Sequence, residues 1–159
     1  MARIEINTFV QAPPDRVFDL ARSIDLHTVS TSSSGEKAVR GTTTGLLGLN
    51  EEVTWRARHF GVWQELTAKM TLLDRPRHFR DEMLKGAFQS MAHDHYFEPA
   101  NGGTMMRDLF VFESPLGILG KFANFAFLKS YMKSFLIERN RILKETAESS
   151  EWRRYLEDV

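Results

Sequence analysis

Two aspartates and two histidines stand at alternating positions of neighbouring extended runs in the middle of the chain. They are Asp81 in FRDEML, His93 and His95 in MAHDHYF, and Asp108 in TMMRDLF. Because successive side chains of a strand point to opposite faces, His93 and His95 share one face. The other side chains of that parity are apolar: Phe79, Met83, Met91, Phe97, Met106, Phe110 and Phe112. This face is therefore predicted to point inward and to carry the four ionisable groups with it.

The chemistry open to these groups begins with His95 and Asp108, which the expected strand pairing places opposite each other. A carboxylate beside an imidazole fixes its tautomer and raises its basicity, as a general base or a metal ligand requires. Alternatively, the two side chains only hydrogen-bond each other in the core, because buried polar groups need partners. Two histidines two positions apart can share a metal with a carboxylate, but nothing else in the sequence has metal-ligand spacing. We predict neither a metal nor a cofactor.

A hairpin earlier in the chain indicates which side of the sheet is the inner one. Strong strands over 51–59 and 62–73 flank a tight Phe60-Gly61 turn, and a two-residue loop fixes their pairing. Opposed residues share a face. The inner face of the hairpin then holds Val53, Trp55, Ala57, Gln64, Leu66, Ala68, Met70 and Leu72. Continuing the pairing through the later turns predicts Met70 near Asp81, Asp81 near Met91, and His95 near Asp108.

The elements around this meander follow from changes of hydrophobic period. An alternating run predicts a first strand over 3–10, and helical spacing predicts short helices over 15–24 and 25–31. A weak strand is expected over 36–43. After Ser114-Pro115 the period becomes helical, which predicts one long helix from Leu116 to about Thr146. We expect a single domain over residues 1–147 and a charged tail over 148–159.

Composition narrows the function classes. The 159 residues carry 21 basic and 21 acidic side chains, so no net field favours nucleic acid or an anionic membrane. Cysteine is absent, which excludes disulfides and thiol chemistry. The N-terminus does not read as a signal peptide, and no apolar run approaches the roughly 20 residues of a membrane span. We therefore expect a cytoplasmic protein that neither binds nucleic acid nor inserts stably into a membrane, and we leave a homodimer open.

A strand, two short helices, an antiparallel meander and a long C-terminal helix resemble the helix-grip fold. START-related, polyketide-cyclase-like and birch-pollen-allergen-like proteins share that order. The runs GLLGLNEEVTWRARHFGVWQELTAKMT, FRDEMLKGAFQSMAHDHYFE, GTMMRDLF, SPLGILG and FLKSYMKSFLIERNRILK resemble the ligand-binding SRPBCC proteins, in a branch also labelled cell-division-inhibitor-like. The resemblance implies an α+β fold, with a curved antiparallel sheet of about six or seven strands and the long helix over a cavity.

The chain contains 12 Phe and 7 Met, and the excess of these residue types at the expected seam between sheet and helix favours a ligand pocket over a closed core. The predicted ligand-binding residues are Trp55, Leu66, Met70, Asp81, Met91, His93, His95, Asp108, Phe110, Phe122, Phe125 and Met132. For any one apolar member, the ordinary role in a core is the simpler interpretation.

Three functions fit this sequence, and the first is preferred. The first is carriage or sensing of a small hydrophobic or amphipathic molecule, lipid-like or polyketide-like. The second is an enzyme of the cyclase, aromatase or hydrolase type, in which His95, backed by Asp108, acts as general acid or base. The third is a protein-interaction module that docks a partner through its aromatic helix and Trp152. The sequence leaves open whether any reaction is catalysed.

Overall fold

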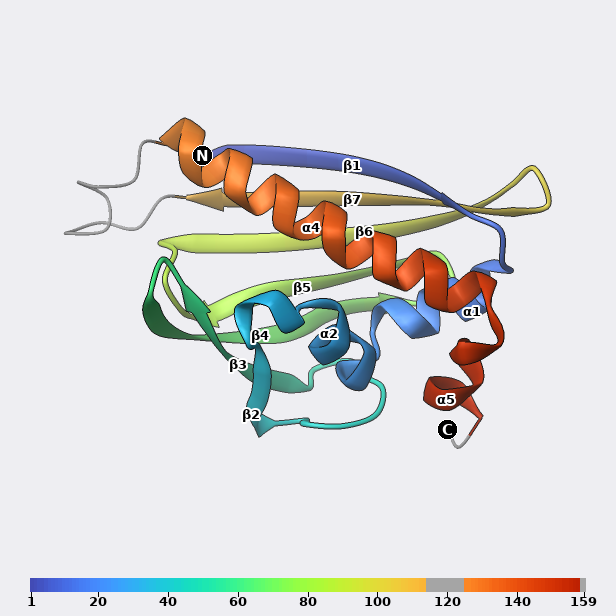
Figure 1. Cartoon of the computed structure of the whole chain (residues 1–159), viewed down its shortest axis with the longest axis horizontal. Helices are drawn as coiled ribbons and strands as arrows, with labels where there is room; N and C mark the ends of the chain where they lie inside the picture. The colour runs from blue at the N-terminus through green and yellow to red at the C-terminus, as the bar shows by residue number, and fades with distance from the viewer. Residues whose placement is uncertain (114–124, 158–159) are drawn as a thin grey trace.

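The computed structural model of the chain describes residues 1–113 and 125–157 (Figure 1). The predicted α+β helix-grip architecture is confirmed: a curved antiparallel sheet is combined with short helices and one long C-terminal helix. In chain order the elements are β1 (Ala2–Val10), α1 (Pro14–Ala21), α2 (Ile24–Ser30), η1 (Ser32–Ser34), β2 (Lys37–Gly41), β3 (Glu52–His59), β4 (Val62–Asp74), β5 (His78–Lys85), β6 (Ser90–Ala100), β7 (Gly103–Glu113), α4 (Phe125–Glu148), η2 (Ser150–Trp152) and α5 (Arg153–Leu156).

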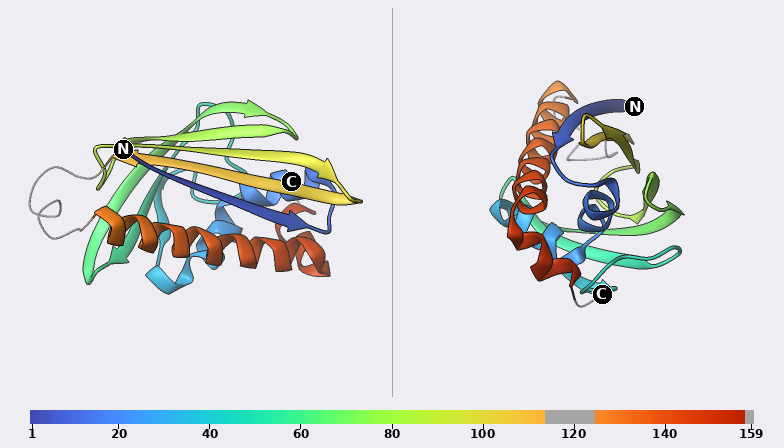
Figure 2. Two further views of the ribbon diagram at one scale, coloured as in Figure 1. Left: turned by 90° about the horizontal axis from the view of Figure 1, so that it is seen from above. Right: turned by 90° about the vertical axis from the view of Figure 1, so that its right-hand side faces the viewer.

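The seven strands form one sheet in the order β1-β7-β6-β5-β4-β3-β2. Strands β2 to β7 follow one another as a meander, whereas β1 pairs with β7 at the far edge. The sheet bends around α4, which lies along its concave side (Figure 2). The inner face of the sheet is therefore the one that α4 covers, as the sequence pattern predicts. Leu72 is an exception: it was predicted to point inward but is exposed, because the pairing of β4 with β5 shifts between Met70 and Leu72.

The β3–β4 hairpin pairs as expected from its turn. His59 lies opposite Val62, and the predicted pairs Trp55–Leu66 and Val53–Ala68 follow. The turn residues Phe60 and Gly61 both have positive φ, at 54° and 77°. Two positive φ values in a two-residue loop give a backbone twist that matches the strands, so the turn sets the register.

One predicted contact is displaced by two residues. Asp81 lies opposite His93 and not opposite Met91, although Met70–Asp81 and His95–Asp108 pair as predicted. The prediction assumed a short turn at Lys85–Ala87. In the structure β6 begins only at Ser90, so the connection between β5 and β6 is longer. Because the displacement is an even number of residues, the same side chains still face inward.

Helix α4 presents a stripe of buried side chains to the sheet. At helical spacing these are Leu128, Leu136, Arg139, Asn140, Leu143 and Ala147. The predicted helix began at Leu116, and its first residues, up to 124, lie outside the described part of the chain; the helix ends at Glu148, close to the predicted end. The described helices include none that is both long and apolar enough to cross a bilayer.

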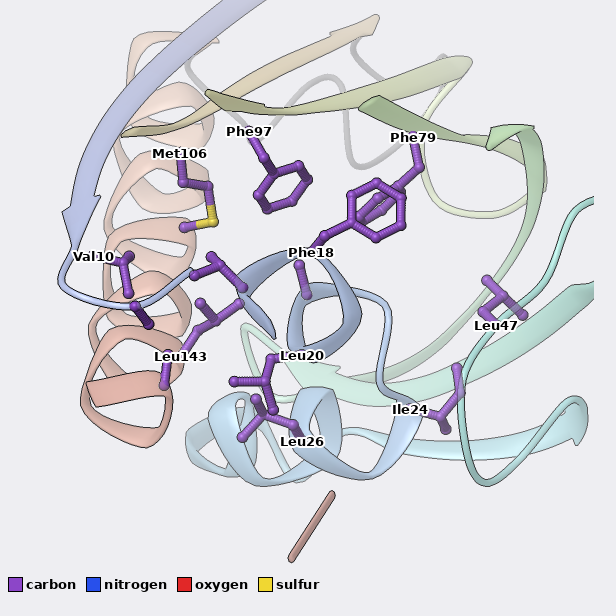
Figure 3. Packing of buried hydrophobic residues seen from close by; sticks show 14 of the residues in the cluster. Val10, Phe18, Leu20, Ile24, Leu26, Leu47, Phe79, Phe97, Met106 and Leu143 are labelled. Atoms are coloured by element: carbon purple, nitrogen blue, oxygen red, sulfur yellow. The ribbon is translucent and has the colours of Figure 1, made fainter. Parts of the chain in front are cut away.

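The hydrophobic core is densest around α1 (Figure 3). Phe18 is fully buried, with its ring edge-on to Phe79 at 5.3 Å and to Phe97 at 5.2 Å. A second buried cluster joins β1, β6 and β7 to α4 through Ala2, Ile4, Ile6, Met91, Phe110, Phe112, Leu128 and Leu136. Helix α4 is thus held to the sheet by apolar contacts in both clusters.

The C-terminal segment packs back on the body. Trp152, Tyr155 and Leu156 contact the core cluster around α1, and the Arg16 guanidinium lies 4.2 Å from the centre of the Trp152 ring. A cation over an indole face is a favourable contact.

Candidate functional site

A cavity of about 400 Å³ lies between the inner face of the sheet and α4. Its wall is mainly apolar and includes nine of the twelve predicted ligand-binding residues: Trp55, Leu66, Met70, Asp81, Met91, His93, His95, Phe110 and Met132. Asp108 lies behind this wall. Phe122 and the side chain of Phe125 lie outside the described part of the chain.

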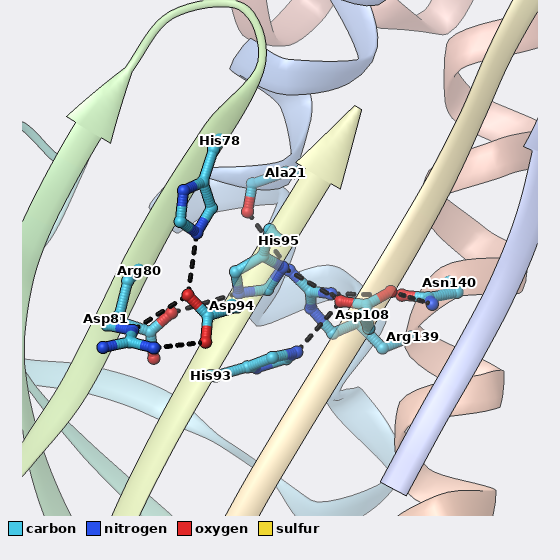
Figure 4. Close-up of polar contacts among 10 residues, drawn as sticks. All are labelled: Ala21, His78, Arg80, Asp81, His93, Asp94, His95, Asp108, Arg139 and Asn140. Carbon is cyan, nitrogen blue, oxygen red and sulfur yellow. Dashed lines mark hydrogen bonds and ion pairs between the residues drawn. The ribbon is translucent and has the colours of Figure 1, made fainter. Parts of the chain in front are cut away.

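Asp81, His93 and His95, the polar residues among these nine, belong to one hydrogen-bonded cluster on β5, β6 and β7 (Figure 4). The Asp108 carboxylate accepts a bond from His93 Nε2 at 2.9 Å, while His95 Nε2 lies 3.1 Å from Asp81 Oδ1. His95 Nδ1 is 2.9 Å from Asp108 Oδ1, an ion-pair distance, but no hydrogen bond to it has good geometry among the described residues. His95 is therefore enclosed between two carboxylates.

Stacking holds the imidazoles in place. The His95 ring stacks on Phe79 with centroids 4.2 Å apart, and its other neighbour is the His93 ring at 3.7 Å. The alternation of β6 puts His93 and His95 on one face, so the strand itself dictates this contact.

Helix α4 completes the shell around Asp108. Asn140 Nδ2 donates to Asp108 Oδ2 at 2.6 Å, and Arg139 lies 3.6 Å from Asp108 Oδ1. Arg139 also donates to the Ala21 carbonyl at 3.2 Å and to the Asn140 side chain at 3.1 Å. The buried aspartate thus connects the sheet, α4 and α1.

Burial and the charged neighbours set the protonation states. Burial lowers the pKa of His93 to about 4, with a further contribution from His95, so His93 is neutral at pH 7. Burial also opposes the charged form of His95, but Asp108 and Asp81 outweigh it and raise the pKa of His95. Burial would raise the pKa of Asp108, yet its interactions with His93 and His95 hold it well below the ordinary value. The two carboxylates thus favour the protonated form of His95, and the two histidines favour the ionised form of Asp108.

Asp81 is the member of the cluster with the greatest exposure. Its side chain is 21% exposed, against 2% for His95 and 1% for Asp108. Asp81 lines the cavity, so its exposed atoms face the cavity. Burial opposes the charged form of its carboxyl, but the hydrogen bond with His95 and the charges of His95, His93 and Arg139 outweigh it and lower the pKa of Asp81. A bound molecule would meet Asp81 before His95 or Asp108.

A metal ion is one further candidate for this cluster. One atom each from Asp81, His93 and His95 lies within 4.8 Å of the others, which is the donor set of a two-histidine, one-carboxylate site. The two imidazole rings are tilted by 35°, and His93 Nε2 and His95 Nε2 each face an aspartate oxygen. An ion bound to either of these nitrogen atoms would therefore replace a hydrogen bond to an aspartate.

Other polar groups line the cavity away from this cluster. His27 on α2 bonds to Glu36 and lies over Trp55, with ring centroids 4.1 Å apart. His59 Nδ1 lies 2.7 Å from the Tyr131 hydroxyl, which links the β3–β4 hairpin to α4.

The cavity reaches the surface near this link. Phe60, at the tip of the β3–β4 hairpin, is 51% exposed and Phe127 on α4 is 57% exposed, yet both line the cavity. The Phe60 ring centre is 4.6 Å from that of Tyr131 and 5.7 Å from that of Phe127. These three aromatic residues therefore form the mouth of the cavity.

Sequence reasoning missed Arg139 and Asn140. A signal was present, because both fall in the apolar stripe of α4 between Leu136 and Leu143, and buried polar residues require partners. It also missed His27, Glu36, His59 and Tyr131, whose contacts join elements far apart in sequence.

The family model for polyketide cyclase / dehydrase and lipid transport proteins matches residues 1–148. The chain belongs to this family. Its members are SRPBCC proteins, a group associated with binding of small hydrophobic ligands and with polyketide cyclase-type activity. No curated protein sequence matches the chain.

Solved structures of other proteins share the fold at low identity. TTHA0849 from Thermus thermophilus is 18% identical, with a TM-score of 0.75 over 92% of this chain and 97% of that one. Ara h 8.0201 is 13% identical, with a TM-score of 0.66 over 93% and 99%. The di-domain ARO/CYC StfQ from the steffimycin biosynthetic pathway is 13% identical, with a TM-score of 0.70 over 92% of this chain and 50% of that one. At such identities the similarity shows the fold alone.

Proposed function

We propose that the protein binds a small hydrophobic or amphipathic molecule, lipid-like or polyketide-like, as its carrier or sensor. The observation behind this is the cavity of about 400 Å³, which lies in the size range of small-molecule sites and has mainly apolar walls with a few polar groups. The family supports the same function, since its members include lipid transport proteins.

A cyclase-type enzyme is the second candidate, because the family description also names polyketide cyclases. The geometry does not favour the acid–base role predicted for His95 with Asp108. A general base needs a free lone pair within reach of the substrate, whereas both ring nitrogens of His95 face carboxylates. In an enzyme, the cavity-lining Asp81 or the neutral His93 is the better base.

Filling the cavity tests the proposed function. Ala68 on β4 is buried and lines the cavity, so Ala68→Phe places a ring where the ligand would lie. We expect binding of the neutral dye N-phenylnaphthylamine, followed by fluorescence, to weaken at least about tenfold, because overpacking costs about 1–3 kcal/mol.

The matched control is Thr71→Phe, which adds the same ring to an exposed position of β4. It should retain dye binding, and circular dichroism should show that both variants are folded. A wild-type protein that binds no dye, and from which native mass spectrometry detects no co-purified molecule, would contradict the proposed function.

A further inference from the structure

We propose that the bound molecule presents a neutral hydrogen-bond donor, an alcohol or a phenol, to the carboxylate of Asp81. The cavity would then select hydroxylated ligands over the corresponding ethers and hydrocarbons. This inference rests on the proposed function, because it names the chemical class of ligand for the same cavity.

The first argument is the unused acceptor on Asp81. Its Oδ1 faces His95 Nε2 at 3.1 Å, and among the described residues no hydrogen bond reaches Oδ2. An ionised carboxylate accepts at both oxygens. Asp81 also keeps 21% of its side chain exposed, toward a wall that is otherwise mainly apolar. A ligand donor placed here would satisfy a polar atom that the protein leaves without a partner.

The second argument is the tautomer of His93, the other cluster member on the cavity wall. Its Nε2 donates to Asp108, because an ionised carboxylate can only accept. The pKa of about 4 makes the ring neutral, so Nδ1 carries a lone pair. The wall therefore offers two acceptors, from Asp81 and His93. A ligand carbonyl or carboxylate would face them without a donor.

The third argument concerns charge and decides between a hydroxyl and an ammonium group. The carboxylates of Asp81 and Asp108 both face the His95 imidazole, at 3.1 and 2.9 Å, and the Arg139 guanidinium lies 3.6 Å from Asp108, so basic groups offset the charge of both carboxylates. The cluster is therefore close to neutral overall and exerts little attraction on a ligand cation. The guanidinium of Arg139 is also engaged, by the Ala21 carbonyl and Asn140. A neutral donor fits this balance better than a charged one.

The rest of the ligand meets apolar atoms. Met70 lies opposite Asp81 on β4, and Phe110 lies opposite His93 on β7. Both line the cavity. A flat aromatic ring with a hydroxyl at one end combines the two requirements, which makes naphthol and its methyl ether a suitable pair of probes.

The experiment compares the affinities of naphthol, its methyl ether and naphthalene by calorimetry at pH 7. We expect naphthol to bind the wild type about 10- to 100-fold more tightly than the ether, the range for a hydrogen bond to a charged group. Asp81→Leu should remove this preference by weakening naphthol binding alone. In Asp81→Asn an amide NH₂ takes the place of one oxygen, so the preference should fall or turn toward the ether.

The control variant is Glu82→Gln, which removes the neighbouring carboxylate of β5, on the opposite face of the strand. It should retain the wild-type preference for naphthol. If wild type binds naphthol and its ether equally, or if Asp81→Leu keeps the preference, the inference is wrong while ligand binding stands. If none of the probes nor N-phenylnaphthylamine binds, the proposed function itself is wrong.

Discussion

Asp108 is the single residue that most of the polar cluster depends on. It is 1% exposed and is approached by His93, His95, Arg139 and Asn140. Replacing it by alanine would remove the carboxylate that faces both the His95 imidazole and the buried Arg139 guanidinium. We expect Asp108→Ala to lower the free energy of unfolding by about 3–5 kcal/mol, the usual cost of breaking a buried ion pair.

Urea denaturation measures this loss. Glu5→Gln is the control, since Glu5 pairs with Arg3 and Arg107 on the exposed surface, where such pairs contribute about 0–1 kcal/mol. A loss for Asp108→Ala no larger than that of the control would show that the cluster does not stabilise the fold.

The two histidines should give the free energy of unfolding opposite pH dependences. The pKa of His93 falls from 6.5 in the unfolded chain to about 4, so the unfolded state binds more protons between these values. Stability from His93 is therefore complete above pH 6.5 and is lost as the pH falls toward 4. The pKa of His95 is raised, so its contribution is complete below pH 6.5 and is lost as the pH rises through the folded-state value.

We accordingly expect a maximum of stability near pH 6.5, measured by urea unfolding across this range. His93→Gln should reduce the slope on the acid side and His95→Gln the slope on the alkaline side, so each variant serves as control for the other. His59 adds to the acid-side slope, because burial lowers its pKa too. An unchanged profile in both variants would contradict these protonation states.

Residue identity and strand parity were enough to predict the neighbourhood of His93, His95, Asp81 and Asp108. Which of these side chains bond to each other was harder to predict. His93 shares Asp108 with His95, and which nitrogen meets which oxygen depends on side-chain rotamers, which no sequence spacing encodes. The contact of Asn140 with Asp108 depends on how α4 is rotated about its axis, and that rotation is set by all the contacts between α4 and the sheet.

At the scale of elements, the strand register could be predicted across a tight turn, whose backbone geometry is restricted, but not across a longer connection. The Phe60-Gly61 turn allows one pairing of its strands, and the predicted register of β3 and β4 is confirmed. The longer connection between β5 and β6 allows several, and there the predicted register was wrong by two residues. The hydrophobic alternation still fixed the inner face, because a one-residue slip would expose it.

The hairpin tip should control how fast a ligand enters and leaves. Phe60 contacts Phe127 and Tyr131 across the mouth of the cavity, so Phe60→Ala opens a passage without touching the inner wall. We expect the dissociation rate of N-phenylnaphthylamine to rise about tenfold or more, with a smaller change in affinity, because opening the mouth speeds association as well.

Stopped-flow fluorescence measures both rates. The matched control is Val62→Ala, at the next exposed position after the turn. Equal rates in the wild type and in Phe60→Ala would place the route of access elsewhere.

At the scale of the whole molecule, the C-terminal segment shows where local patterns stop being informative. Its charged sequence was compatible with a frayed tail, a partly helical one, or one that docks on a partner. In the structure Trp152 contacts Arg16 of α1, more than 130 residues earlier in the chain. Only the assembled fold brings these residues together, so neither segment carries a sign of the other.

The pairing of the first strand with the last has a consequence for synthesis. Ala2 lies opposite Phe112, and Ile4 opposite Phe110. During synthesis β1 is made before β7, so the apolar side of β1 has no strand partner until β7 has followed it out of the ribosome. This edge of the sheet, and the packing of α4 against it, can therefore form only after β7 and α4 have both been synthesised, so the first half of the domain cannot complete its fold alone.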